Sequence, residues 1–200
     1  MIPVAVTQRV DLKVRIGERR DALDQRWSGL LLSCGLLPIL VPNSLPAARA
    51  LLEQVAVAGI LLTGGNDPVA CGGDAPERDE TENWLIRRAL DGGLPLLGVC
   101  RGMQMIQHHF GVPLHPVSGH VCAEQQITVN GVRTSANSYH RFGATGTVPE
   151  LEVWAVADDG VVKAMRHRSR RVLGFMWHPE RFAQGRASDI ALIRQFFQAA

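Results

Sequence analysis

Short apolar runs alternate with amphipathic stretches along the first half of the chain. Four runs bounded by proline, glycine or asparagine have the length and composition of buried strands, and they cover residues 2–7, 36–42, 58–65 and 94–100. Apolar residues at helical spacing predict helices over residues 20–35, 45–56 and 81–93, and a further helix from Arg101 onwards. This alternation predicts a parallel sheet whose ligand site lies beyond the carboxyl ends of its strands.

The second half of the chain follows a different pattern. Asn130 and Gly131 separate two alternating runs and predict a hairpin over residues 125–137. Residues 151–167 and 170–178 predict further strands, and residues 187–200 predict a final helix. We therefore expect one domain over residues 1–200, of the α/β class: three layers, an open and mostly parallel sheet with helices on both faces, and an added β-hairpin region.

Composition narrows the class of protein. The formal net charge is only +2, and the basic residues are dispersed apart from a cluster over residues 166–171, so nucleic acid is not an expected partner. The chain has neither a membrane-length apolar run nor a signal-peptide pattern, so we expect a cytoplasmic protein and no membrane partner. Its four cysteines lack CxxC spacing and its seven histidines lack metal-binding spacing, so we expect no metal and no cofactor.

Cys100 is a candidate nucleophile. The segment LPLLGVCRGMQMIQHHFG, residues 94–111, predicts a strand, a sharp turn at Cys100 and a helix, and a helix start favours a reactive thiolate. The alternative is a structural thiol, because free cysteines are among the residues most often buried. A second motif favours the nucleophile: in GFMWHPERF a predicted strand delivers His178, and Glu180 follows as a carboxylate that can orient it.

GVCRGMQ and WHPE together resemble the signature pair of the class I glutamine amidotransferases and their hydrolase relatives, over essentially the whole chain. The resemblance implies a flavodoxin-like sheet and a triad of Cys100, His178 and Glu180. In such a triad Cys100 attacks a γ-glutamyl carboxamide and forms a γ-glutamyl thioester. The resemblance also implies that the backbone amides of Gly65, in LLTGGNDP, and of Arg101 form the oxyanion hole.

Further motifs resemble the γ-glutamyl hydrolase branch of this family, which releases glutamate without passing ammonia to a synthase. These motifs are GGNDP, RDETE (residues 78–82), NSYH (137–140) and DGVVKAM (159–165). The resemblance implies that Gln104 contacts the α-amino and carboxylate groups of the substrate, and that Asn137, Ser138 and His140 line the cleft wall. Arg78, Asp79 and Glu82 would form a structural or substrate-facing network, or an ordinary helix cap with ion pairs.

The amino-terminal stretches VAVTQRV and RDALDQRW resemble the γ-glutamyl-CDP-amidate hydrolases of capsule phosphoramidate biosynthesis more than the γ-glutamyl-GABA hydrolases. The implied substrate is an anionic, nucleotide-linked γ-glutamyl compound, for which arginine is a suitable ligand. Gln8 and Arg9, directly after the first predicted strand, are the residues expected to bind it. Lys163 and Met176 depart from the family, which usually has an acidic residue and a glutamine there, so substrate contacts can differ while the triad is retained.

Three alternatives stay open. A γ-glutamyl-GABA-type hydrolase would act in amine catabolism, a glutaminase subunit would feed ammonia to a partner synthase, and an inactive protein on the same fold would only bind. Retention of Cys100, His178 and Glu180 disfavours the last, because binding requires none of them. The leaving group of the small-molecule substrate and the formation of a homodimer are left open by the sequence.

Overall fold

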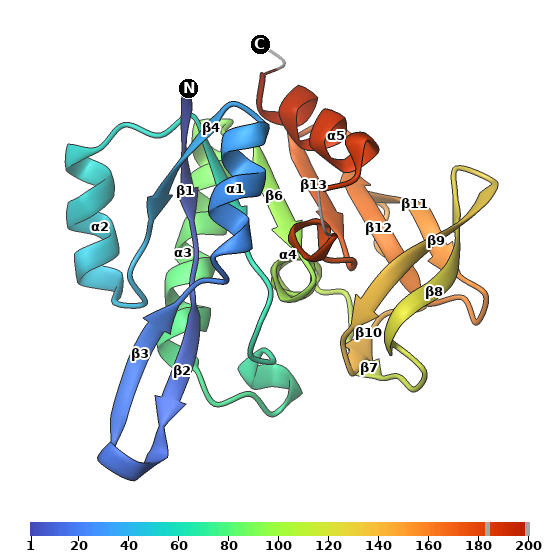
Figure 1. Ribbon diagram of the computed structural model, residues 1–200, viewed down its shortest axis with the longest axis horizontal. Coiled ribbons are helices and arrows are strands. Elements are labelled where there is room, and N and C mark those ends of the chain that lie inside the picture. The colour runs from blue at the N-terminus through green and yellow to red at the C-terminus, as the bar shows by residue number, and fades with distance from the viewer. Residues whose placement is uncertain (183–184, 199–200) are drawn as a thin grey trace.

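A nine-stranded sheet forms the centre of the protein (Figure 1). The computed structural model describes residues 1–182 and 185–198. The strands of this sheet are β1 (Ile2–Val6), β4 (Leu36–Leu40), β5 (Gly59–Leu62), β6 (Leu96–Val99), β8 (Val121–Val129), β9 (Val132–Tyr139), β11 (Leu151–Ala157), β12 (Val162–His167) and β13 (Val172–Phe175). Their order is β4-β1-β5-β6-β13-β12-β11-β8-β9; the first five are parallel, and each of the last four is antiparallel to the strand before it.

Helices cover both faces of this sheet, which confirms the expected α/β class. They are α1 (Arg26–Ser33), α2 (Leu45–Gln54), α3 (Pro76–Gly92), α4 (Arg101–His109) and α5 (Ala187–Gln198), with short 3-10 helices η1 (Val14–Ile16), η2 (Val69–Cys71) and η3 (Pro179–Arg181). Successive residues of a strand point to opposite faces. Leu61 therefore packs in a core with α1 and α5, whereas Ile60 and Leu62 pack with α2, α3 and α4. Burial on both faces explains why β5 is apolar throughout.

The expected hairpin belongs to the main sheet. Asn130 (φ 48°) and Gly131 (φ 81°) form the turn between β8 and β9, as a two-residue hairpin loop of this sequence requires. The hairpin pairs through β8 with β11 and so extends the sheet at one edge. A separate two-stranded sheet joins β7 (His115–Pro116) to β10 (Phe142–Gly143).

The helix expected over residues 20–35 is wrong at its beginning. Strand β3 (Glu18–Ala22) occupies this stretch and pairs with β2 (Arg9–Lys13) in a hairpin that projects from the body of the protein (Figure 1). Helix α1 begins only at Arg26, whose backbone N–H donates to the Asp24 carboxylate at 3.0 Å. The charged residues of β3 have no apolar face to bury as a helix, which explains the difference.

Other predicted boundaries differ less. Helix α3 begins at Pro76 and not at residue 81, because proline suits the first position of a helix. The final helix agrees with the prediction up to Gln198, and residues 199–200 lie outside the described residues. Within the described ranges, no helix is long and apolar enough to cross a membrane.

Candidate active site

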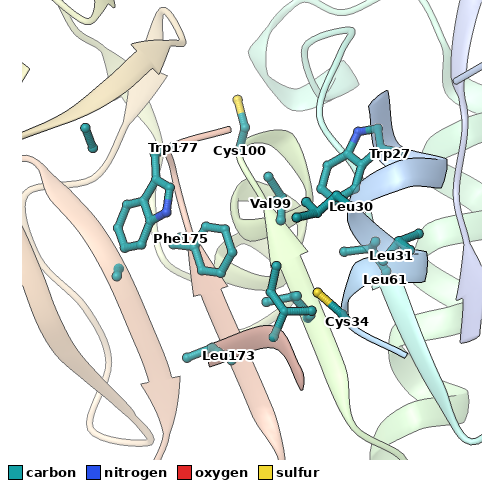
Figure 2. Packing of buried hydrophobic residues seen from close by; sticks show 14 of the residues in the cluster. Trp27, Leu30, Leu31, Cys34, Leu61, Val99, Cys100, Leu173, Phe175 and Trp177 are labelled. Atoms are coloured by element: carbon teal, nitrogen blue, oxygen red, sulfur yellow. The ribbon is translucent and has the colours of Figure 1, made fainter. Parts of the chain in front are cut away.

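Cys100 occupies the turn between β6 and α4. Its backbone lies at φ 51° and ψ −108°, a conformation that non-glycine residues rarely adopt and that costs energy. Figure 2 shows its sulfur pointing away from the packed side chains of Val99 and Phe175. Cys34, in contrast, lies within the core, where burial raises the pKa of its thiol to about 11. The strained turn thus presents Cys100, and not Cys34, for chemistry.

Two glycines allow other segments to approach this turn closely. A Cβ atom at Gly102 would collide with the carbonyl group of Leu62 on β5. A Cβ atom at Gly64 would lie 2.6 Å from Cε1 of His178 and 3.5 Å from Cβ of Cys100. Since only glycine fits at these positions, the segments that follow β5, β6 and β13 meet at one point.

His178 interacts with both Cys100 and Glu180. Its Nδ1 lies 2.7 Å from Oε1 of Glu180, and both side chains are buried. Its Nε2 makes no hydrogen bond of standard geometry within residues 1–182 and 185–198. Burial disfavours the imidazolium, but the charges of Cys100 and Glu180 outweigh this effect and raise the pKa of His178 to about 9. A histidine in this state carries a transferable proton at neutral pH.

Asn137, on β9, fixes the backbone of His178. Its Oδ1 accepts a hydrogen bond from the His178 N–H at 2.7 Å, and its Nδ2 donates to the His178 carbonyl at 2.9 Å. Both groups are buried, so the loss of either partner would leave a polar atom unpaired. Asn137 is expected from the sequence as part of the cleft wall; its contacts instead position the candidate base.

The loop after β5 carries a candidate oxyanion-hole amide. The N–H groups of Gly65 and Arg101 donate no backbone hydrogen bond in the described part of the chain. Arg78, on α3, donates to the carbonyl oxygens of Thr63, at 2.8 Å, and of Gly65. The peptide group that carries the Gly65 N–H lies between these two carbonyls, so the guanidinium restrains it from both sides.

A buried charge network connects this loop to the turn at Cys100. The Glu82 carboxylate accepts hydrogen bonds from Arg78, at 2.9 Å, and from Arg101. Arg101 also pairs with Asp79. Burial alone would raise the pKa of Glu82, but the two guanidinium groups hold it below its usual range. Because its members bind one another and the loop, the geometry favours the structural interpretation of this motif.

Glutamine in place of Glu82 is expected to destabilise the protein. Two buried guanidinium groups would lose their common carboxylate, and breaking a buried ion pair costs about 3–5 kcal/mol of unfolding free energy. Urea unfolding followed by circular dichroism measures the loss. Glu80→Gln is the matched control, because Glu80 lies on the same helix and is exposed. Equal unfolding midpoints for the two variants would contradict the structural role of the network.

The site opens into a cavity of about 450 Å³. Of the residues expected from the sequence, its lining includes Arg9, Gly65, Cys100, Arg101, Gln104, His140 and His178. Nε2 of Gln104 donates to the Phe142 carbonyl at 2.8 Å, which leaves the amide oxygen available as an acceptor. The loops after the first, third and fourth parallel strands along the chain therefore converge as the βαβ pattern predicts.

Gln8 and Ser138, like Asn137, are expected substrate-binding residues that do not line this cavity. Nε2 of Gln8 donates to the Val41 carbonyl at 3.1 Å. The Ser138 hydroxyl is buried and donates to the His120 carbonyl at 2.9 Å. Both side chains are thus occupied by contacts within the protein.

The cavity also contains residues that the sequence does not single out. Tyr139, Arg141 and Arg181 line it, and the Arg181 guanidinium lies 4.5 Å from the centroid of the Tyr139 ring. Each is adjacent in the chain to an expected residue, since Tyr139 and Arg141 flank His140 and Arg181 follows Glu180. Their position next to expected site residues is the sequence signal that could have identified Tyr139, Arg141 and Arg181.

The fold and this site define the class of protein. A sequence profile of the family described as Glutamine amidotransferase class-I matches residues 23–200. The chain belongs to this family, which confirms the resemblance carried by its motifs.

Individual relatives are similar over most of the chain. The γ-glutamyl-CDP-amidate hydrolase of Campylobacter jejuni subsp. jejuni serotype O:2 is 27% identical over 199 residues, which cover 97% of this chain and 96% of that protein. The γ-glutamyl-γ-aminobutyrate hydrolase of Escherichia coli O157:H7 is 30% identical, covering 91% and 86%. The crystal structure of a Thermotoga maritima glutamine amidotransferase has a TM-score of 0.69 at 14% identity, covering 90% and 76%; this likeness concerns the fold alone.

Proposed function

We propose that the protein is a cysteine-dependent hydrolase that cleaves a γ-glutamyl amide bond and releases L-glutamate through a γ-glutamyl thioester. One observation carries the proposal: Cys100 lies at a strained turn beside His178, which is held through Nδ1 by Glu180. The names of the two similar hydrolases support the bond type, since both refer to γ-glutamyl compounds.

In the first half of the reaction, Cys100 attacks the γ-carbonyl carbon of the substrate. The negative charge that develops on the carbonyl oxygen is stabilised by the N–H groups of Gly65 and Arg101. His178 then gives its proton to the leaving nitrogen, the carbon–nitrogen bond breaks, and the amine departs. The glutamyl group remains on Cys100 as a thioester.

In the second half, water replaces the amine. His178, now neutral, takes a proton from the water molecule as it attacks the thioester carbon. The carbon–sulfur bond breaks, and L-glutamate leaves the thiolate of Cys100 beside a protonated His178. Glu180 orients the imidazole through both halves and stabilises its charged form.

The proposed substrate is γ-glutamyl-CDP-amidate. Arg9, Arg141 and Arg181 line the cavity, whereas Asp67 contributes one carboxylate to it. Guanidinium groups bind phosphate oxygens in bidentate geometry, so this excess of positive charge suits a nucleotide diphosphate as leaving group. The Campylobacter relative, named for such a substrate, supports the same choice.

A substrate panel tests this proposal. The purified protein is offered L-glutamine, γ-glutamyl-GABA and γ-glutamyl-CDP-amidate in parallel, and glutamate release is measured. We expect the highest kcat/KM for the nucleotide. Preference for γ-glutamyl-GABA would assign the protein to amine catabolism, and consumption of glutamine only with added cell extract would indicate a partner synthase.

Alanine in place of Arg141 is expected to raise KM for the nucleotide by about 10-fold, as for the loss of one charge-assisted hydrogen bond. KM for L-glutamine should not change, because its leaving group, ammonia, carries no anionic group that a guanidinium could bind. Arg133→Ala is the control, since Arg133 is exposed and pairs with Asp158 at 2.7 Å. An equal rise for both substrates would contradict phosphate binding by Arg141.

A further inference from the structure

Lys163, on β12, is a buried cation close to the site. Its side chain is 2% exposed. Nζ donates to Oγ of Ser138 at 2.9 Å and to Nε2 of His140 at 2.7 Å. Neither partner carries a negative charge, and an ammonium group buried without an ionic partner costs stability. A cost of this kind suggests a role beyond packing.

Lys163 lies behind the cleft wall and contacts residues of the segment that forms it. Its backbone carbonyl accepts a hydrogen bond from Met176 at 2.8 Å, two residues before His178. Its partner His140 lines the cavity, and its partner Ser138 follows Asn137, which holds the backbone of His178. Lys163 is therefore connected to the cleft wall on two sides.

Negative charges near Lys163 come from several elements. Burial lowers the pKa of Lys163 to about 8; the Cys100 charge opposes this most strongly, followed by Asp159 and Cys122. Strand β13 connects the two groups, because the Cys100 N–H donates to the Phe175 carbonyl at 2.8 Å and the next residue, Met176, donates its N–H to the Lys163 carbonyl at 2.8 Å. An ammonium group this close to the cleft favours a thiolate there by Coulombic attraction. Lys163 thus places a positive charge at neutral pH behind the wall of the cavity that contains Cys100 and His140.

The two histidines on this side of Lys163, His140 and His120, do not supply the positive charge near Cys100. Burial and the Lys163 charge lower the pKa of His140 to about 3, so it stays neutral. Its Nδ1 then donates to the Phe142 carbonyl at 2.8 Å, and Nε2 accepts from Lys163. His120 lies beyond His140, with its Nε2 2.8 Å from Oδ2 of Asp159. Within the Lys163–His140 pair, Lys163 therefore carries the positive charge.

We propose that Lys163 is a positioning residue of the reaction centre, whose buried ammonium holds Ser138 and His140 in place and stabilises the anionic forms of Cys100 and of the acylation intermediate. The effect on the intermediate rests on the proposed function. The effect on the Cys100 thiol does not, because it is present in the protein without substrate. Loss of the Lys163 charge should therefore lower the reactivity of the Cys100 thiol even where the packing of the protein is unchanged.

Alkylation of Cys100 by iodoacetamide tests this inference without a substrate. The rate is followed from pH 5 to 10 by mass spectrometry of the Cys100 peptide, with the Cys71 peptide as internal reference. Lys163→Met and Lys163→Gln should react about 10-fold more slowly at pH 7. Lys13→Met, which removes an exposed lysine from the β2–β3 hairpin, should keep the wild-type profile.

The two variants separate charge from hydrogen bonding. Glutamine keeps a donor but no charge, so a wild-type profile for Lys163→Gln would overturn the electrostatic role even if Lys163→Met fails to fold. Folded variants should have unfolding temperatures at or above that of the wild type, because a buried charge is removed. Altered alkylation without hydrolysis of any γ-glutamyl amide by the wild type would support the Lys163 effect on Cys100 and refute the proposed function.

Discussion

Alanine in place of Cys100 is expected to abolish glutamate release and to leave the fold intact. No thioester can form without the sulfur, and loss of a triad nucleophile typically costs about 10⁴- to 10⁶-fold in kcat. Cys100 is buried beside the core, but its sulfur points away from Val99 and Phe175 (Figure 2), so we expect the loss of this one atom to disturb the packing little. Glutamate release and thermal unfolding measured on the same preparation will separate the two effects.

A second cysteine provides the control for this experiment. Cys71, on η2, is half-buried and does not line the cavity, so Cys71→Ala should keep wild-type turnover. Substantial hydrolysis by a folded Cys100→Ala variant would refute the nucleophile. Loss of activity in both variants would show that the substitutions act through the fold.

Glutamine in place of Glu180 is expected to lower kcat by about 10²- to 10⁴-fold, less than the loss of Cys100, because an orienting group supports a nucleophile that is still present. The pH profile should change as well. His178 is raised to a pKa of about 9, so its proton for the leaving group is lost as pH rises through this value. Without the Glu180 charge, the alkaline limb should move to lower pH.

The profile of kcat/KM against pH for the wild type and Glu180→Gln checks this prediction. Glu124→Gln provides the control, because Glu124 is exposed on β8. An alkaline limb at the same pH in all three proteins would mean that Glu180 does not act through the charge of His178.

Apolar patterns predict the central fold because burial on both faces imposes them. The runs that became β1, β4, β5 and β6 contain few polar residues, and turn or helix signals bound each of them. The β2–β3 hairpin lacks such a pattern. Its strands carry charged side chains toward solvent, and their pairing depends on a turn that hydrophobic spacing does not specify.

Site residues are predictable where chemistry restricts the residue type. A cysteine at a strand-to-helix turn and a His–Glu pair at another strand end are such cases; Cys100 and His178 line one cavity, and their role in catalysis stays a prediction. The role of Gln8 or Asn137 is not predictable in this way, because a side-chain amide can bind a ligand or a backbone group equally well. Only the three-dimensional contacts distinguish the two.

The hydrogen bonds between Asn137 and the backbone of His178 make the reaction centre depend on the outermost strand of the sheet. Strand β9 pairs on one side only, and such edges open locally at a lower free energy than a central strand. A transient opening there would release His178 while the parallel strands stay folded. We therefore expect glutamate release to be lost at a temperature below that of global melting.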